Sequence, residues 1–410
     1  MTGKEYTDKR IYEYCKETGN ALSEMRNRLG FLSNSEYFIG LAKERLMHNV
    51  CDSKRYVALC GHQVPETIIR AAGAIPFYIP SGSHALNAFA DELLPRDADG
   101  FARSVYGYIK NSAFPLNKDM LIIVPLVNDN IKKLYMLLKS EGFSVHGIAF
   151  PPVKNDEGYE EWDRQIELLA EAVSKATGNR ITQKKLAEQA RIVEEAKKAA
   201  SSFCKAALHS EMAIDDIGRE FLLETYYYAD NLEEWTREIS LAAEQLKKNS
   251  PAEKGGAGVL LAGSPVIFPN MKIPKLIEKS GMRLLGVIDY PKQMLLMSEK
   301  VCGGLREIGR GYLKNDSSAA YVENDEFFRG VVKAAESLNV RGIIMHIIKG
   351  WIECDFEAER IEGYFSVKNI PLFRIETDFN TQDVEQLSIR LDAFSEMLKV
   401  RSESKGGADK

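Results

Sequence analysis

Cysteines are the residues of this chain with the most recognisable chemistry, because a thiolate can hold iron or carry electrons. The 410 residues include six cysteines, and no two of them show CxxC or another spacing typical of metal ligands. Cys60 ends an expected strand, whereas Cys302 and Cys354 lie in segments expected to be loops. The three could face one cleft as ligands of an iron–sulfur centre, or they could be buried thiols that pack like small apolar groups.

Two further groups near Cys60 could move protons. Glu66 stands in the first turn of an expected helix that begins at Val64 and Pro65, where the helix dipole favours a carboxylate. That carboxylate could face a cleft, or it could only stabilise its own helix. His62 precedes this helix and is the histidine best placed as a proton carrier, although packing is the more common role of an isolated histidine.

Apolar runs predict the strands that would position these loops. The expected strands fall into two groups and cover residues 56–60, 75–79, 119–124 and 144–150, then 258–263, 283–289, 342–348 and 371–375. In open α/β sheets, the loops after the carboxyl ends of strands build the site. In the second group these loops read KGWIECD and ETDFNTQD.

The pattern predicts an α/β fold with two Rossmann- or flavodoxin-like parallel-sheet domains, a helical segment between them and a helical N-terminal arm. The expected boundaries are 1–55 for the arm, 56–152 for the first α/β domain, 153–252 for the helical region, 253–400 for the second α/β domain and 401–410 for a disordered tail. A helix break is expected after Gly178, with Thr182 as the N-cap of the next helix.

Four separated segments resemble the subunits of 2-hydroxyacyl-CoA dehydratases and benzoyl-CoA reductases. They are VPETIIRAAGAIPFYI over 64–79, LLPRDADGFARSVYGYI over 93–109, DMLIIVPLVNDNIKKLYMLL over 119–138 and the last folded block over 341–398, which contains IPLFRIETDF. The segments follow one another in the order of that family and span most of the chain. The resemblance therefore implies the family's α/β fold.

The cysteines of that family are missing at the matching positions. The resemblance places them at Asp99, Asn128 and Trp351, where the family would hold a [4Fe-4S] cluster. Such a cluster is held by thiolates, whereas Asp ligates iron weakly, Asn poorly and Trp not at all. We therefore expect no cluster in the usual place. A shift of three residues would put Cys354 at the third position, but the other two would still lack sulfur.

The resemblance also implies a reaction and partners. The family removes water reductively from a 2-hydroxyacyl-CoA or reduces the ring of benzoyl-CoA, with an electron from an ATP-dependent activator protein and two related subunits. We expect a subunit without its own cluster, in a heterodimer with a cluster-bearing homologue or in a homodimer. Glu66, Arg103, Ser104 and Tyr106 are its expected cleft-facing groups. Two alternatives remain: a non-catalytic module that binds an acyl-CoA or an anion, and a redox protein with a relocated iron–sulfur centre.

Composition narrows these expectations. A net charge of −5 gives no reason to expect nucleic-acid binding. The first residues lack the apolar core of a signal peptide, and no apolar run approaches the roughly 20 residues of a membrane helix. Scattered cysteines are typical of a reducing compartment. We therefore expect a cytoplasmic protein, and the family resemblance implies a role in anaerobic metabolism.

Overall fold

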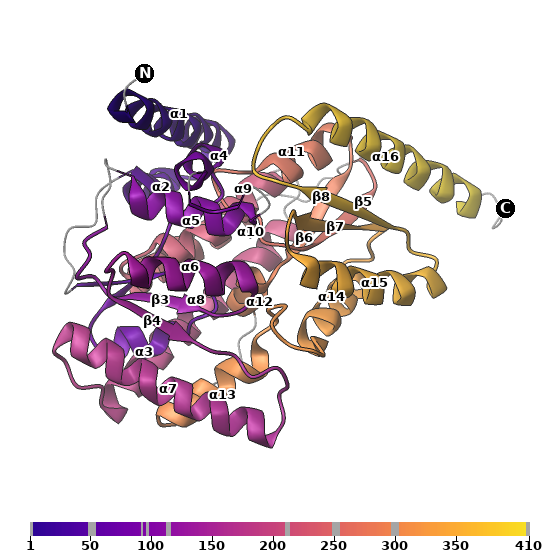
Figure 1. The fold of residues 1–410 in the computed structure, drawn as a ribbon. Helices are drawn as coiled ribbons and strands as arrows, with labels where there is room; N and C mark the ends of the chain where they lie inside the picture. The colour runs from indigo at the N-terminus through magenta and orange to yellow at the C-terminus, as the bar shows by residue number, and fades with distance from the viewer. Residues whose placement is uncertain are drawn as a thin grey trace.

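Two lobes, each built around a four-stranded parallel sheet, form the described part of the chain (Figure 1). The computed structural model describes residues 3–47, 55–91, 93–95, 98–111, 116–209, 214–247, 255–296 and 303–406. Helices cover both sheets on two faces, as parallel strands buried on both sides require. The predicted α/β class with two parallel-sheet units and a helical arm is confirmed.

The first sheet has the strand order β2-β1-β3-β4. Its short apolar strands are β1 (Tyr56–Leu59), β2 (Ile75–Tyr78), β3 (Ile122–Pro125) and β4 (Val145–Ile148). The elements between them are α3 (Glu66–Ala71), α4 (His84–Asn87), the 3-10 helix η1 (Ala88–Ala90), α5 (Gly100–Lys110) and α6 (Asp129–Ser140). Because β1 and β3 are neighbours and parallel, the loops after them open at the same edge of the sheet.

The second sheet repeats this order as β6-β5-β7-β8. Its strands are β5 (Gly258–Gly263), β6 (Arg283–Ile288), β7 (Gly342–Ile348) and β8 (Leu372–Thr377). Every residue of β7 is buried, as its run of isoleucines predicts. The helices of this half are α11 (Lys272–Lys279), α12 (Tyr290–Leu296), α13 (Leu305–Asn315), α14 (Asp325–Ser337), α15 (Ile352–Val367) and α16 (Val384–Gly406). Figure 1 shows α11 and α16 on one side of the sheet, with α14 and α15 on the other.

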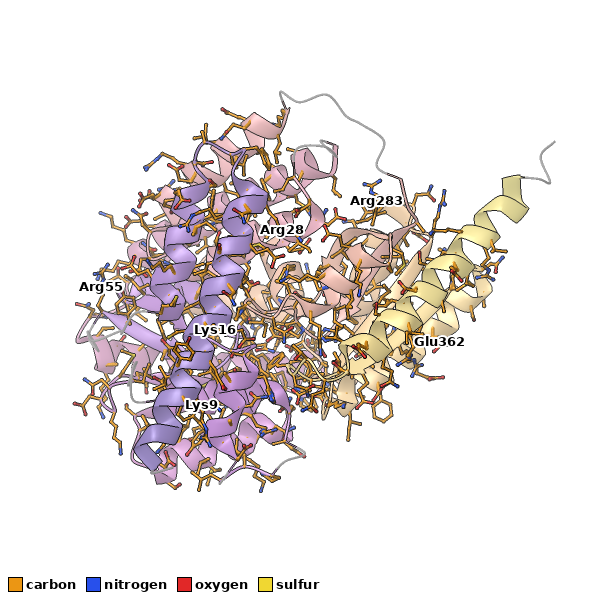
Figure 2. The ribbon with its side chains drawn as sticks, turned by 90° about the horizontal axis from the view of Figure 1, so that it is seen from above. Lys9, Lys16, Arg28, Arg55, Arg283 and Glu362 are labelled. Atoms are coloured by element: carbon orange, nitrogen blue, oxygen red, sulfur yellow. The ribbon has the colours of Figure 1, made fainter. Side chains whose placement is uncertain are left out.

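Helices also form the N-terminal arm and the connection between the lobes. They are α1 (Gly3–Leu29) and α2 (Ser35–Met47) in the arm, then α7 (Asp156–Thr177), α8 (Gln183–His209), α9 (Asp216–Glu224), the 3-10 helix η2 (Thr225–Tyr228) and α10 (Leu232–Lys247). Seen from above, α1 lies along the first lobe (Figure 2). Its Arg28 pairs with Asp215 at 2.7 Å and with Glu278 of α11 at 2.9 Å, so the arm is also bound to the second half.

Helix α13 belongs to the second half of the sequence but packs on α7, beneath the first sheet in Figure 1. The Trp162 indole donates a hydrogen bond to the Gly309 carbonyl at 2.7 Å, and Arg310 pairs with Asp163 at 2.7 Å. Gly309 allows this approach, because a Cβ at that position would overlap the Ile166 side chain. The two halves of the chain are therefore interleaved.

Several local predictions can be compared with the structure. Gly178 ends α7 in the left-handed conformation, and Thr182 Oγ1 accepts a hydrogen bond from the Lys185 amide before α8, as expected for the predicted break. The predicted strand over 119–124 begins only at Ile122. Helix α16 continues to Gly406, so the predicted tail begins too early, and residues 407–410 lie outside the described ones. Residues 48–54 and 248–254, at two predicted boundaries, also lie outside them.

One apolar cluster runs from the first sheet into the second. It includes Ile122 and Val124 of β3, Met345 and Ile347 of β7, and Trp351 after β7. The lobes therefore share buried surface at the edge where their loops meet. Among the described residues, no helix combines the length and the apolar character that a membrane crossing needs.

Candidate functional site

The three positions matched to the family's cysteines share one structural role. Asp99, Asn128 and Trp351 are the residues immediately before α5, α6 and α15, where the N-cap lies. A helix N-terminus leaves backbone N–H groups without intrahelical partners, and Asp and Asn are good caps for that reason. Asp99 accepts a hydrogen bond from the Ala102 amide at 2.6 Å, and Asn128 accepts one from the Ile131 amide at 2.9 Å.

Asp99 and Trp351 meet in the interior. Asp99 is fully buried, and burial raises its pKa to about 6, although the Ala102 amide and the Trp351 indole act in the opposite direction. The Trp351 ring is 7% exposed and packs edge-on against Phe101 of α5, with ring centroids 6.1 Å apart. The indole N–H and Asp99 Oδ2 form no hydrogen bond of full geometry with the described residues. An aromatic ring and a capping carboxylate thus occupy two of the three positions.

Asn128 joins the two lobes at the third position. Its amide donates a hydrogen bond to Glu353 Oε1 of α15 at 3.0 Å. Burial raises the pKa of Glu353, and the Asn128 hydrogen bond partly opposes that rise. One turn later, burial raises the pKa of Glu357 to about 7. The site therefore contains carboxyl groups whose pKa values are raised by burial, next to an amide and an indole.

These groups line a small cavity between the lobes, here called the Trp351 cavity. The space open to the centre of a water-sized molecule is about 30 Å³, enough for roughly two or three waters. Its lining combines apolar, amide, hydroxyl and carboxyl groups: Gln63, Val127, Asn128, Gly263, Tyr290, Ser317, Ala319, Asn324, Phe327, Met345, Trp351, Glu353, Cys354 and Glu357.

The residues at this cavity do not fit a [4Fe-4S] cluster. Such a cluster needs thiolates, and none of the three matched positions supplies sulfur. Cys354 lines the cavity, but burial raises the pKa of its thiol to about 12, and Ser264 Oγ lies 3.7 Å from its sulfur. Cys60 is buried, and burial raises the pKa of its thiol too. Cys302 lies outside the described residues.

No other metal site emerges from the part of the chain that the structure describes. Within it, no three His, Cys, Asp or Glu side chains are grouped so as to hold a metal ion. The relocated cluster of Cys60, Cys302 and Cys354 stays a sequence hypothesis, because Cys302 is not among the described residues. The two described thiols lie in surroundings that disfavour the ionised form that metals bind.

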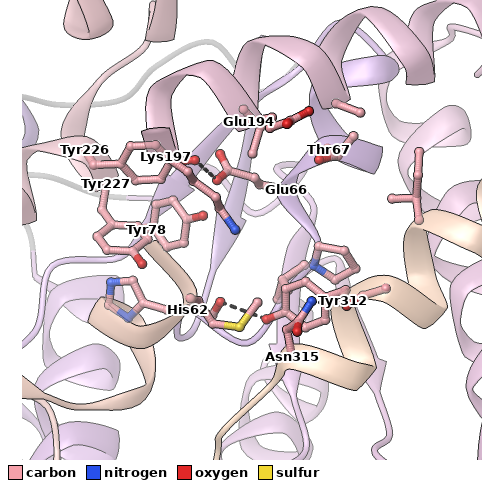
Figure 3. A pocket seen from close by; sticks show the side chains of 17 residues that line it. His62, Glu66, Thr67, Tyr78, Glu194, Lys197, Tyr226, Tyr227, Tyr312 and Asn315 are labelled. Carbon is pink, nitrogen blue, oxygen red and sulfur yellow. Dashed lines mark hydrogen bonds between the residues drawn. The ribbon is translucent and has the colours of Figure 1, made fainter. Parts of the chain in front are cut away.

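Of the four polar residues predicted for the cleft, Glu66 is the one that lines a described cavity. This second cavity, here called the Lys197 cavity, lies where α3 and α8 approach η2 and α13 (Figure 3). Glu66 accepts a hydrogen bond from Arg70 at 2.8 Å and a short one from the Tyr226 hydroxyl. Both carboxylate oxygens of Glu66 therefore accept a hydrogen bond.

The other three predicted residues lie on α5 and make contacts of their own. Arg103 pairs with Asp91, and Ser104 Oγ accepts a hydrogen bond from the Ser83 amide at 3.3 Å. The Tyr106 hydroxyl donates to Glu141 Oε1 at 2.7 Å. None of the three lines the Trp351 cavity or the Lys197 cavity. The structure does not bring them together with Glu66.

His62, the predicted proton carrier, also lines the Lys197 cavity. Its ring stacks on Tyr78 with centroids 5.0 Å apart and meets the edge of Tyr227 at 4.4 Å. Burial, followed by the Lys292 charge, lowers its pKa to about 3. The imidazole is therefore neutral at physiological pH and can accept a proton only at considerable cost.

Sequence reasoning missed three groups at these cavities: Glu353, Glu357 and Lys197. The two glutamates are one helical turn apart on α15, directly after the KGW loop, and that spacing could have indicated them. Lys197 belongs to the long charged helix α8 and looked like any other lysine of that helix. Its position becomes significant only once α3 and α13 are packed beside it.

The described residues form an α/β protein with two four-stranded parallel sheets, and the Trp351 cavity lies between its two lobes. A sequence profile described as "2-hydroxyglutaryl-CoA dehydratase, D-component" matches residues 62–398. The match covers most of the chain, and the protein belongs to this family.

Two relatives are similar over most of their length. The chain is 23% identical over 344 residues to the "(R)-phenyllactyl-CoA dehydratase beta subunit" of Clostridium sporogenes. The aligned region covers 82% of this chain and 89% of the relative. It is 25% identical over 350 residues to the "Putative dehydratase subunit YjiM" of Escherichia coli (strain K12), with the same two coverages.

Proposed function

We propose that this protein is a dehydratase-type subunit that contributes to an acyl-CoA cleft without holding a [4Fe-4S] cluster of its own. The observation that carries the proposal is that Asp99, Asn128 and Trp351 each stand directly before a helix, with Asp99 beside Trp351 and with Asn128 and Trp351 lining one cavity. An oxygen, an amide and an indole stand where the family resemblance places sulfur. A site of this kind can shape a cleft but cannot hold iron through thiolates.

A homologous subunit with the three cysteines intact would then supply the cluster, as the other half of a heterodimer. Support comes from the relatives, since each of their names describes a subunit of a dehydratase. The ATP-dependent activator that the resemblance implies would then dock on that partner. A homodimer of this chain would lack the cluster in both halves.

Within this proposal, Glu66 is the candidate acid–base group, because it lines a cavity and lies at the start of a helix next to the central strand β1. Arg103, Ser104 and Tyr106 would shape the cleft indirectly. Their contacts fix α5, and α5 begins at Asp99, next to the Trp351 cavity.

The second candidate is a non-catalytic module that binds an acyl-CoA or another anion. Trp351 favours it, since a buried indole fills space at the position where the family resemblance expects a cluster ligand. A redox protein with relocated iron has weaker support, because Cys60 and Cys354 are buried thiols with raised pKa values.

The test is co-expression of this chain with a homologous subunit that carries all three cysteines, followed by anaerobic purification. We expect a stable heterodimer with about four irons per pair, the content of one [4Fe-4S] cluster, and iron should be lost when the partner's cysteines are replaced. A lone chain that binds about four irons after reconstitution would overturn the proposal. A chain that forms no pair but binds acyl-CoA would favour the binding module.

A further inference from the structure

The Lys197 cavity is a partly enclosed space with aromatic walls and charged groups in its lining. Its lining residues come from both halves of the sequence: His62, Val64, Pro65, Glu66, Thr67, Tyr78, Ala190, Val193, Glu194, Lys197, Tyr226, Tyr227, Met294, Ile308, Gly311, Tyr312 and Asn315. Figure 3 shows Lys197 reaching into this space, with Glu66 beside it and with His62 and Tyr312 on the opposite side.

The charges of the cavity leave one cation without a salt bridge. Glu66 is 2.8 Å from Arg70, and Glu194 is 2.6 Å from Lys198. Among the described residues, no carboxylate lies within salt-bridge distance of the Lys197 ammonium. Burial lowers the pKa of Lys197, with Glu66 acting in the opposite direction from a longer range. An anion bound in the cavity would favour the charged form of Lys197, which burial alone disfavours.

A second polar group of the cavity is also unsatisfied. His62 Nδ1 is buried and has no hydrogen-bond partner among the residues that the structure describes. A buried polar atom without a partner costs free energy, and such atoms are uncommon outside sites that receive a ligand or water. Lys197 and His62 come from different elements, so the two unsatisfied groups are independent observations about the same space.

The size and walls of the cavity limit what could enter. The space open to the centre of a water-sized molecule is about 90 Å³, which corresponds to roughly six to nine waters. The rings of His62, Tyr78, Tyr227 and Tyr312 provide flat, polarisable walls. A small molecule with a flat or apolar body matches these walls.

We propose that the Lys197 cavity binds a small carboxylate, whose charged group pairs with the Lys197 ammonium and whose body lies against the His62 and tyrosine rings. The cavity is complete within one chain. The proposal therefore goes beyond the proposed function, because it requires neither a partner subunit nor a CoA thioester.

The experiment is calorimetric titration of the full-length protein with benzoate and with benzamide, which has the same ring but no charge. We expect saturable binding of benzoate and at least tenfold weaker binding of benzamide. Lys197→Met keeps an unbranched apolar stem and should weaken benzoate binding by about tenfold or more, the usual effect of losing a charge-assisted hydrogen bond. Lys184→Met is the matched control, because Lys184 is an exposed lysine of the same helix that does not line the cavity, and its loss should leave binding unchanged.

A second measurement uses the native protein, so it does not depend on a variant that folds. Amines are acetylated with and without benzoate, and the labelling of each lysine is read by mass spectrometry. Benzoate should slow the labelling of Lys197 and leave that of Lys184 unchanged. Equal affinity for benzoate and benzamide, no saturable binding of benzoate, or equal protection of the two lysines would overturn the proposal. Failure of heterodimer formation or of acyl-CoA binding would leave this result unaffected.

Discussion

Asn128 and Glu353 connect the two lobes through one hydrogen bond of 3.0 Å, at a position where the family resemblance places an iron ligand. Asn128 also caps α6 through the Ile131 amide, so one side chain serves both a helix end and the contact between the lobes. Sulfur could not do the same, because a thiol is a weak donor and acceptor. The residue at this matched position therefore makes structural contacts that a cysteine could not make equally well.

Restoring the three cysteines should restore iron binding if the positions still form a ligand set. Asp99→Cys, Asn128→Cys and Trp351→Cys combined in one protein should take up iron and sulfide under anaerobic reconstitution and gain broad visible absorbance. The native chain should show neither. Iron, acid-labile sulfide and the visible spectrum are the measurements.

The control for this variant removes three helix caps elsewhere in the chain, at Asn155, Thr182 and Asp215, and replaces them with cysteine. It has the same number of new thiols and a comparable loss of capping. Equal iron uptake by the two triple variants would mean that the matched positions have no special geometry.

The Asn128–Glu353 contact should be measurable as a coupling energy. A double-mutant cycle of Asn128→Ala and Glu353→Ala should give about 1 kcal/mol of coupling in urea unfolding, the usual net contribution of one hydrogen bond. Glu359, on the same helix but paired with Arg374, provides the control. The cycle of Asn128→Ala with Glu359→Ala should give coupling near zero, and similar values in the two cycles would contradict the contact.

Asp99 should make stability depend on pH in a predictable direction. Burial raises its folded-state pKa to about 6 from an ordinary value of 3.8. The folded protein then binds the proton more tightly than the unfolded chain, so stability falls as pH rises from about 4 through 6. Asp99→Asn keeps a capping oxygen and removes this dependence, which is on the order of 2–3 kcal/mol.

Urea unfolding of the native protein and of Asp99→Asn between pH 4 and pH 8 measures the difference. Asp325→Asn is the control, because the Arg360 hydrogen bond lowers the pKa of Asp325 from the ordinary value of 3.8. The stabilising effect of this carboxylate is complete above that value, so the control variant and the native protein should show the same pH dependence between about pH 4 and pH 8. A parallel pH dependence for the native protein and Asp99→Asn would contradict the raised pKa.

Gly107 should be intolerant of a side chain. A Cβ on this residue of α5 would overlap the Leu86 carbonyl of α4, so Gly107→Ala should cost about 1–3 kcal/mol of stability through overpacking. Gly19, also in a helix interior, has nothing within 4 Å of the same position. Gly19→Ala should stabilise the protein by about 0.5–1 kcal/mol, because alanine favours a helix. Denaturant unfolding of both variants gives the comparison, and equal effects would show that α4 can move away from α5.

The sheets were predictable because each strand is a compact apolar run. Two predicted strands match the structure at both ends, namely 342–348 with β7 and 258–263 with β5. Each of these apolar runs is bounded directly by turn residues. The strand expected over 119–124 begins late, because Asp119 and Met120 form a turn stabilised by Asn117. Local sequence patterns cannot show such a turn when the residues beside it are also apolar.

The site was predictable only in part. The four segments that resemble the family's motifs pointed to Asp99, Asn128 and Trp351. In the structure, each of these residues stands directly before a helix. The contact of Asn128 with Glu353 joins residues 225 positions apart, and no local pattern encodes it. The significance of Lys197 likewise depends on tertiary packing.

The packing of α13 on α7 has a consequence for how this protein could be divided. Residues 309 and 310 supply a hydrogen bond and an ion pair to the first lobe from the second half of the chain. Two fragments produced by a cut between Lys247 and Gly255 would each expose an apolar face that the other fragment covers. They should stay associated after cleavage and fold by complementing each other. A chimaera made from the first half of one relative and the second half of a distant one would have to preserve the contact between α13 and α7.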